Sequence, residues 1–113
     1  MPIAVESVSN LNRKNEIINS NKLVVIDVFG SWCNPCKAVD EPYKKLAEKY
    51  NSPGTCMLIK EDVDLGLQQP DGVKIKGVPA FLFFLNGKYD GMISGADISG
   101  VEHMIKTLSS KTS

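Results

Sequence analysis

Two cysteines, Cys33 and Cys36, stand three positions apart near the end of the stretch LVVIDVFGSWCNPCK, which covers residues 23–37. Cysteines at this spacing serve as half of a zinc site, as a disulfide that staples the chain, or as a dithiol that is oxidised and reduced in turn. The apolar run before them is typical of a buried strand. The remaining residues distinguish these three kinds of chemistry.

Neither a zinc site nor a structural disulfide suits the sequence. Zinc needs four ligands, and the further cysteine and histidine, Cys56 and His103, match no zinc-binding spacing. A chain of 113 residues with 42% hydrophobic content can bury a core without cross-links, and three cysteines are an odd number for a disulfide framework. We therefore expect no metal, interpret the pair as a redox couple, and expect Cys56 to be an inert buried side chain.

The composition indicates one domain that spans residues 1–113. The 13 basic and 13 acidic residues form no block of like charge, so we expect no nucleic acid and no membrane as partner, and favour other proteins. Residues 1–10 lack the basic and apolar regions of a signal peptide, and every apolar run is too short to cross a bilayer. We therefore expect a cytoplasmic protein, a setting in which stable disulfides are uncommon.

The elements around the cysteines are a strand and a long helix. Residues 22–29 are nearly all β-branched or apolar, as in a strand of a parallel sheet that is covered on both faces, and Asp27 is the carboxylate inside that run. From Cys33 onward, apolar residues recur at intervals of three and four, which predicts a helix with a kink at Pro42. The buried face of this helix is predicted to contain Val39, Tyr43, Leu46, Ala47 and Tyr50.

Two outer helices are also predicted. Near the N-terminus, residues 3–7 predict a short edge strand, and Ser9 is expected to cap the first helix. Near the C-terminus, Ser99 and Glu102 form the pattern of a capping box. The predicted buried positions are Leu11, Ile17 and Ile18 in the first helix and Val101, Met104, Ile105 and Leu108 in the last.

Three further strands complete the predicted sheet. Residues 55–64 predict the third strand, residues 80–85 the fourth and residues 88–94 the fifth, with the Asn-Gly pair at 86–87 as a hairpin turn. This order predicts an α/β fold with a central mixed five-stranded sheet and helices on both faces. The cysteines then lie at the C-terminal end of a central strand, where open α/β sheets place their active sites.

This position makes the two thiols unlike. At the N-terminus of a helix, Cys33 would face unpaired backbone N–H groups and the positive end of the helix dipole, which lower the pKa of its thiol. Cys36, one turn further along, would be shielded. We therefore expect an exposed Cys33 to attack a disulfide and Cys36 to resolve the mixed disulfide that results, while Pro35 stiffens the first turn of the helix.

The sequence resembles the thioredoxin family over roughly residues 22–108. The motif WCNPCK at residues 32–37 is similar to the family's Trp-Cys-Gly-Pro-Cys-Lys. Further matches stand in the same order and at the family's spacings: Asp27, Lys60 and Asp64 in the third predicted strand, GVPAF at 77–81, NG at 86–87 and SGA at 94–96. The resemblance implies a thioredoxin fold.

The resemblance also implies a substrate site. Pro79 is expected to be the family's cis-proline opposite the cysteines. A shallow groove for an extended substrate segment would be framed by Trp32, Gly77, Val78, Gly95 and Ala96. Asn34 stands where thioredoxins usually have glycine, so we expect it to change the redox potential, in a direction that the sequence leaves open. Pro42 falls one residue later than the family's helix proline.

Asp27 and Lys60 are candidates for proton transfer and its tuning. Burial in a strand covered on both faces should raise the pKa of Asp27, which suits it to relay a proton to and from Cys36; the alternative is a salt-bridged core residue. Lys60 is either a surface charge or a neighbour that tunes Asp27, and the resemblance favours the second. Asp40 and Glu41 are interpreted as ordinary solvated helix charges.

These observations predict a protein-disulfide reductase of the thioredoxin type, a monomer without a bound cofactor. By family analogy, a thioredoxin reductase that uses NADPH and flavin would return its electrons. One alternative is a scaffold or binding module, against which the intact dithiol and the acid behind it argue. The other is a more oxidising disulfide oxidase or isomerase, favoured if Asn34 raises the potential and opposed by the lack of a signal peptide.

Overall fold

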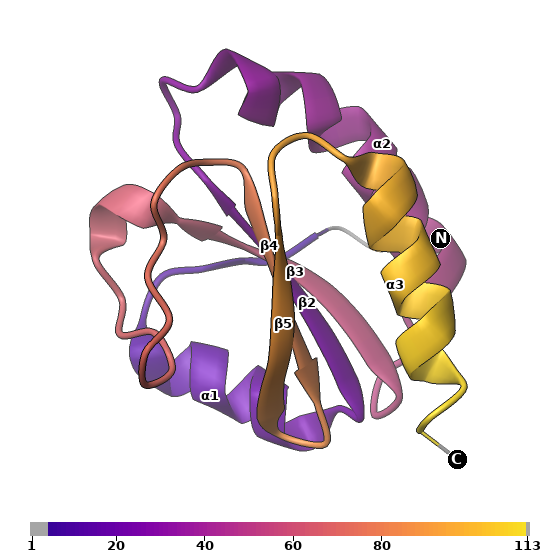
Figure 1. The fold of residues 1–113 in the computed structure, drawn as a ribbon. Helices are drawn as coiled ribbons and strands as arrows, with labels where there is room; N and C mark the ends of the chain where they lie inside the picture. Colours follow the sequence, from indigo (N-terminus) through magenta and orange to yellow (C-terminus); the bar gives the residue numbers. More distant parts are fainter. Residues whose placement is uncertain (1–4, 113) are drawn as a thin grey trace.

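A computed structural model describes residues 5–112, which form a central five-stranded sheet between helices (Figure 1). The strands lie in the order β1-β3-β2-β4-β5; β1, β3 and β2 are parallel, and β4 and β5 are antiparallel to their neighbours. Their bounds are Ser7–Val8 for β1, Leu23–Phe29 for β2, Cys56–Asp62 for β3, Ala80–Leu85 for β4 and Lys88–Ser94 for β5. The predicted mixed α/β sheet is confirmed.

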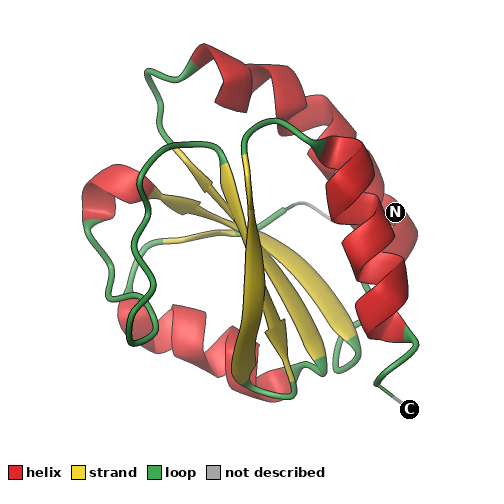
Figure 2. Cartoon of the chain, in the orientation of Figure 1, coloured by secondary structure: helices red, strands yellow, loops and turns green. Residues whose placement is uncertain are grey.

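Helices cover both faces of this sheet (Figure 2). Helix α1, Leu11–Ser20, packs on one face, and helices α2, Asn34–Tyr50, and α3, Ile98–Ser109, pack on the other. A short 3-10 helix, η1, Val63–Leu65, follows β3. Because helices cover both faces, each face of the sheet has its own core, one under α1 and one under α2 and α3.

Within residues 5–112, no helix is long and apolar enough to span a bilayer.

Strand β2 is the centre of the sheet and is buried on both faces. Val24 and Ile26 belong to the core under α1, whereas Leu23 and Val25 belong to the core under α2 and α3. The predicted continuous apolar strand is confirmed, and so is the hairpin: Asn86 and Gly87 adopt positive φ angles of 52° and 84° between β4 and β5. Both angles suit the right-handed twist of the strands that the turn connects.

Helix α2 is fastened to the middle of the sheet through Tyr43. Its hydroxyl, which is fully buried, donates to the Ile59 carbonyl of β3 at 2.8 Å and lies 3.1 Å from the Val25 carbonyl of β2. The helix continues through Pro42. Of its predicted buried positions, Val39, Tyr43, Leu46 and Ala47 are buried and Tyr50 is half-buried. This contact joins the middle of α2 to the middle of β2 and β3.

Both predicted helix caps are wrong, and the helices begin elsewhere. The N-cap of α1 is Asn10 instead of Ser9, because the Asn10 side chain accepts the Arg13 backbone N–H at 2.8 Å. The N-cap of α3 is Asp97, which accepts the Gly100 N–H at 2.9 Å, so Ser99 lies inside the helix. Asparagine and aspartate are strong N-cap residues, and they stand one and two residues from the predicted caps, respectively.

The limits of two predicted strands also change. The N-terminal strand is β1 at Ser7–Val8; of the predicted range 3–7, residues 3 and 4 lie outside the described residues and residues 5 and 6 are not in a strand. Strand β3 ends at Asp62, whose side chain accepts the Asp64 N–H at 2.9 Å and starts η1. Asp64 is therefore in the 3-10 helix, not in the third strand as predicted.

A buried ion pair lies under α1, on the face of the sheet opposite α2. Lys14 of α1 and Glu61 of β3 are 1% exposed each, and the Lys14 ammonium lies 2.8 Å from a Glu61 carboxylate oxygen. The other oxygen accepts from the Gln69 amide at 2.8 Å, and the ammonium also donates to the Gln68 carbonyl at 3.1 Å. These contacts hold residues 66–79, a loop without helix or strand, against the sheet.

The buried pair predicts a stability effect of Lys14→Met. The substitution leaves the Glu61 carboxylate buried without its cation, so we expect the free energy of unfolding to fall by about 3 kcal/mol. Chemical denaturation of the oxidised protein measures it. Arg13→Met is the matched control, because Arg13 is the adjacent residue and pairs with Glu6 on the surface. Equal losses in the two variants would contradict a structural role of the buried pair.

Candidate active site

The two cysteines lie where β2 gives way to α2. Cys33 is the N-cap of α2, and Cys36 lies in the first turn of that helix. Their sulfurs are joined in a disulfide, and their Cα atoms are 5.3 Å apart. Asn34 and Pro35, the residues between them, are the exposed first two positions of the helix. The structure therefore shows the oxidised form of the pair at the predicted helix start.

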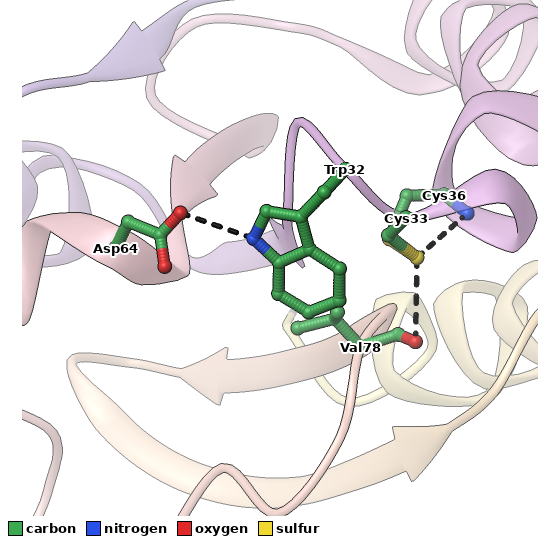
Figure 3. Close-up of a disulfide and its surroundings, with 5 residues drawn as sticks. All are labelled: Trp32, Cys33, Cys36, Asp64 and Val78. Carbon is green, nitrogen blue, oxygen red and sulfur yellow. Dashed lines mark hydrogen bonds between the residues drawn. A yellow bond between two sulfur atoms is a disulfide. The ribbon is translucent and has the colours of Figure 1, made fainter.

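Cys33, the N-cap of α2, contacts the backbone of its own helix and a second chain segment. The Cys36 backbone N–H donates to the Cys33 sulfur at 3.1 Å, and the same sulfur lies 3.5 Å from the Val78 carbonyl oxygen (Figure 3). A backbone N–H directed at this sulfur stabilises negative charge on it.

The expected difference in exposure between the cysteines is wrong for the oxidised protein. Cys33 and Cys36 are each 5% exposed. The disulfide draws both sulfurs under the start of the helix, so exposure alone does not distinguish a nucleophile from a resolving cysteine. What distinguishes them is what each one contacts.

The segment that faces Cys33 contains the predicted groove residues. The Val78–Pro79 peptide bond is cis, as the resemblance implied. The Gly95 N–H donates to the Pro79 carbonyl at 2.8 Å, which joins this segment to the end of β5. Pro79 is buried and Val78 half-buried, while Gly77, Gly95 and Ala96 are exposed. Two separate chain segments therefore present small exposed residues beside the disulfide.

Trp32 flanks the disulfide on another side. Its side chain is held by a hydrogen bond of 3.1 Å from the indole N–H to the Asp64 carboxylate of η1, although the residue is 63% exposed (Figure 3). The ring packs so closely on Gly30 that a Cβ there would lie 2.7 Å from it. Gly30 is thus needed for this packing. Neither contact was predicted from the sequence. Gly30, which stands between β2 and Trp32, is the sequence feature that could have indicated the close packing of the ring.

Asp27 is a buried carboxyl near the end of β2. It is 1% exposed, pairs in register with Lys60 of β3 and Phe81 of β4, and neither carboxyl oxygen has a hydrogen-bond partner in the described protein. Burial raises the pKa of Asp27 to about 7; the charge of Lys60 opposes this shift, and the charge of Asp40 adds to it. Asp27 therefore exchanges a proton near neutral pH.

Lys60 and Asp40 form an ion pair beside Cys36. The Lys60 ammonium lies 2.5 Å from an Asp40 carboxylate oxygen and 4.5 Å from the centre of the Phe29 ring. The hydrogen bond from Lys60 lowers the pKa of Asp40. Asp40 is therefore not the ordinary solvated charge that we expected. A hollow of about 260 Å³ adjoins the pair and is lined by Phe29, Gly30, Ser31, Cys36, Lys37, Asp40 and Lys60.

The other candidate metal ligands lie apart from this site. Cys56 is a free cysteine buried in the core under α2 and α3, and burial raises the pKa of its thiol to about 11. His103 is exposed on α3. Within residues 5–112, no group of three or more histidine, cysteine, aspartate or glutamate side chains is arranged to hold a metal ion.

Comparison with known proteins gives one consistent result. The sequence matches the family Thioredoxin over residues 4–109. A thioredoxin from Neurospora crassa is 32% identical, over 85% of this chain and 82% of that protein. Reduced thioredoxin pre-protein of Schistosoma mansoni is 33% identical with a TM-score of 0.79, over 94% of this chain and 99% of that chain.

A mitochondrial relative has the same fold. Mitochondrial thioredoxin 3 of Saccharomyces cerevisiae, solved in its oxidised form, is 31% identical with a TM-score of 0.76, over 92% of this chain and 95% of that chain. The fold, the family match and the Cys-x-x-Cys pair at the start of α2 all agree. This chain therefore belongs to the thioredoxin family and is a thiol-disulfide oxidoreductase, a protein-disulfide reductase with a Cys-x-x-Cys dithiol.

Proposed function

We propose that Cys33 is the nucleophile of this reductase. The observation that carries the proposal is the backbone N–H of Cys36 directed at the Cys33 sulfur, which sits at the N-cap of α2. The Cys33 thiolate attacks one sulfur of a target disulfide, forms a mixed disulfide with it, and releases the other target sulfur as a thiolate that takes a proton from water. No bound cofactor takes part.

Cys36 completes the reaction with Asp27 as its proton acceptor. The Cys36 thiol gives its proton to the ionised Asp27 carboxyl, and the resulting thiolate attacks the Cys33 sulfur. The Cys33–Cys36 disulfide forms, the target's second sulfur leaves as a thiolate, and Asp27 returns the proton through solvent. The target is reduced by two electrons and the dithiol is oxidised by two. A pKa of Asp27 near 7 supports this role.

The proposed substrate is an extended segment of a protein that carries a disulfide. It would lie in the groove of Trp32, Val78 and Pro79, bordered by the small exposed residues Gly77, Gly95 and Ala96. Asn34 and Pro35, at the first positions of α2, are proposed to set the redox potential through the helix N-terminus.

The proposed setting is that of a monomer in the cytoplasm, formed by residues 1–113 as one domain. There a thioredoxin reductase would return electrons to the disulfide. One relative is a mitochondrial thioredoxin, so the fold itself operates in more than one compartment.

The first test is disulfide reduction in a model substrate. With dithiothreitol as the electron source, the protein is expected to cleave the exposed disulfides of insulin faster than dithiothreitol alone does, because Cys33 is an activated thiol. Turbidity of the precipitated insulin B chain measures the rate. A rate at the dithiothreitol background from the folded protein would reject the proposed reduction and favour a scaffold that leaves its cysteines unused.

The second test separates the roles of the two cysteines. Cys36→Ser is expected to accumulate mixed disulfides with partner proteins, because Cys33 can attack but nothing resolves the product. Cys33→Ser is the matched control and is expected to trap almost nothing. Adducts released from an extract by dithiothreitol and identified by mass spectrometry measure the difference. Equal trapping by both variants, or trapping through Cys56, would reverse or abolish the assignment of roles.

The third test concerns Asp27→Asn. Loss of the proton acceptor should slow reduction of insulin disulfides at pH 7 by at least about tenfold. Burial also predicts a stability effect. Because the folded-state pKa of Asp27, about 7, lies above its value of 3.8 in an unfolded chain, Asp27 destabilises the fold progressively as pH rises from about 4 to 7, and by a constant amount above pH 7.

Denaturation of the oxidised protein measures this second effect. Asp27→Asn should raise the free energy of unfolding by about 3 kcal/mol at pH 8 and change it little at pH 4, where folded Asp27 is protonated. Asp90→Asn, an exposed position on β5, is the control. A stability gain that does not depend on pH would show that the pKa of Asp27 is the same in the folded and unfolded chain, and an unchanged reaction rate would show that Asp27 relays no proton.

A further inference from the structure

Two carboxylates, Asp27 and Asp40, are candidate ion-pair partners of Lys60. Its backbone lies directly beside that of Asp27, since the two residues are paired in the register of β2 and β3. Its ammonium group nevertheless bonds to Asp40 of α2 at 2.5 Å, 4.5 Å from the centre of the Phe29 ring. The ion pair with Asp40 is the only one that Lys60 forms within the described residues. The lysine side chain thus bonds to α2 and not to its neighbour in register on β2.

Asp27 remains without a partner as a result. Both of its oxygens are buried and accept no hydrogen bond from the described protein. The other groups around it supply no cation: Phe81 faces it from β4, while Tyr43 on α2 is a titratable neighbour whose pKa burial keeps high, so its hydroxyl is neutral. Lys60 is the cation whose charge lowers the pKa of Asp27.

The position of Asp40 favours a Lys60–Asp40 ion pair over a Lys60–Asp27 ion pair. It lies on α2 four residues after Cys36, on the hollow that Cys36 and Lys60 also line. Its side chain is 35% exposed, and its second oxygen lies 3.7 Å from the Lys44 ammonium. An ammonium group that pairs with a half-exposed carboxylate loses less hydration free energy than one that pairs with a buried carboxylate, because the first pair keeps more of its water.

We propose that Asp40 is a positioning residue that holds the Lys60 ammonium group at the mouth of this hollow and so leaves the Asp27 carboxyl without an ion-pair partner. The proposal rests on the proton-transfer role given to Asp27 above and deepens it. With Lys60 bound to Asp40, Asp27 can take the proton of Cys36 and give it up again near neutral pH. If Lys60 paired with Asp27, the carboxylate would be held in its ionised form and would accept a proton poorly.

The test is a titration of Asp27 in the oxidised protein, in which neither active-site cysteine titrates. The side-chain carboxyl ¹³C shift of Asp27 is followed by NMR from pH 4 to pH 10 in the original protein, Asp40→Asn, Lys60→Met and the double variant. Glu41→Gln is the matched control: Glu41 neighbours Asp40, carries the same charge and also contacts Lys44, at 3.5 Å, but does not contact Lys60.

The expected result is a fall of about one unit in the Asp27 pKa in Asp40→Asn, because the released Lys60 can approach the carboxylate. In the Lys60→Met background, the same substitution should move the pKa by less than half as much. Glu41→Gln should leave it in place. An equal shift with and without Lys60 would overturn the proposal, because Asp40 would then act on Asp27 directly; so would the absence of any shift in Asp40→Asn.

The kinetic counterpart distinguishes this proposal from the proposed function. The rate at which Cys36 resolves a preformed mixed disulfide at Cys33 should follow the Asp27 titration, with its pH inflection lowered in Asp40→Asn. The titration of the oxidised protein requires no disulfide exchange. A shifted titration with unchanged resolution kinetics would retain the positioning role of Asp40 and reject proton transfer by Asp27. An unshifted titration would reject the role of Asp40 whatever the kinetics of Asp27→Asn.

Discussion

The burial of β2 on both faces is the constraint on which the rest of this structure depends. Because helices lie over each face of this strand, its side chains are removed from the protein surface, and a carboxyl placed in it, Asp27, is 1% exposed. On one face, α2 is also held to the middle of the sheet by the Tyr43 hydroxyl. The disulfide therefore sits on a rigid junction between the strand and the helix N-terminus.

Among the described residues, each face of the sheet contains one buried carboxylate, and only the one under α1 has an ion-pair partner. Under α1, Glu61 is bonded to the Lys14 ammonium and the Gln69 amide, an arrangement that ties down a long loop. Under α2, Asp27 has neither kind of partner, although Lys60 is its neighbour in register. Because the same fold gives one buried acid both a cation and an amide donor, the lack of either kind of partner at Asp27 is a local property of the active-site face. A structural acid gains from pairing, whereas a proton carrier needs to remain free to change its charge.

The sequence predicted those features that depend on neighbouring residues in the chain. The apolar run of β2, the Asn-Gly turn and the helical spacing of Val101, Ile105 and Leu108 each have a local signature, and each is present in the structure. The helix caps at Asn10 and Asp97 were missed by one or two residues because several capping residues compete at each start. Contacts across the fold had no local signature. The Lys14–Glu61 pair and the Asp40–Lys60 pair join residues 47 and 20 positions apart, and only the packing of helix on sheet brings them together.

The proposed division of labour between the cysteines would also arise from packing, because the two residues have different surroundings. Both residues are equally hidden in the oxidised form, so their difference comes from their neighbours. The Cys33 sulfur meets the Val78 carbonyl, beside the groove where a target segment would lie. Cys36 borders the hollow with Lys60 and Asp40, which none of the groove residues lines. In the proposed arrangement, a target that approaches Cys33 would lie outside the hollow beside Cys36, and residues such as Asp40 could tune the charges for proton transfer without altering the surface that a target contacts.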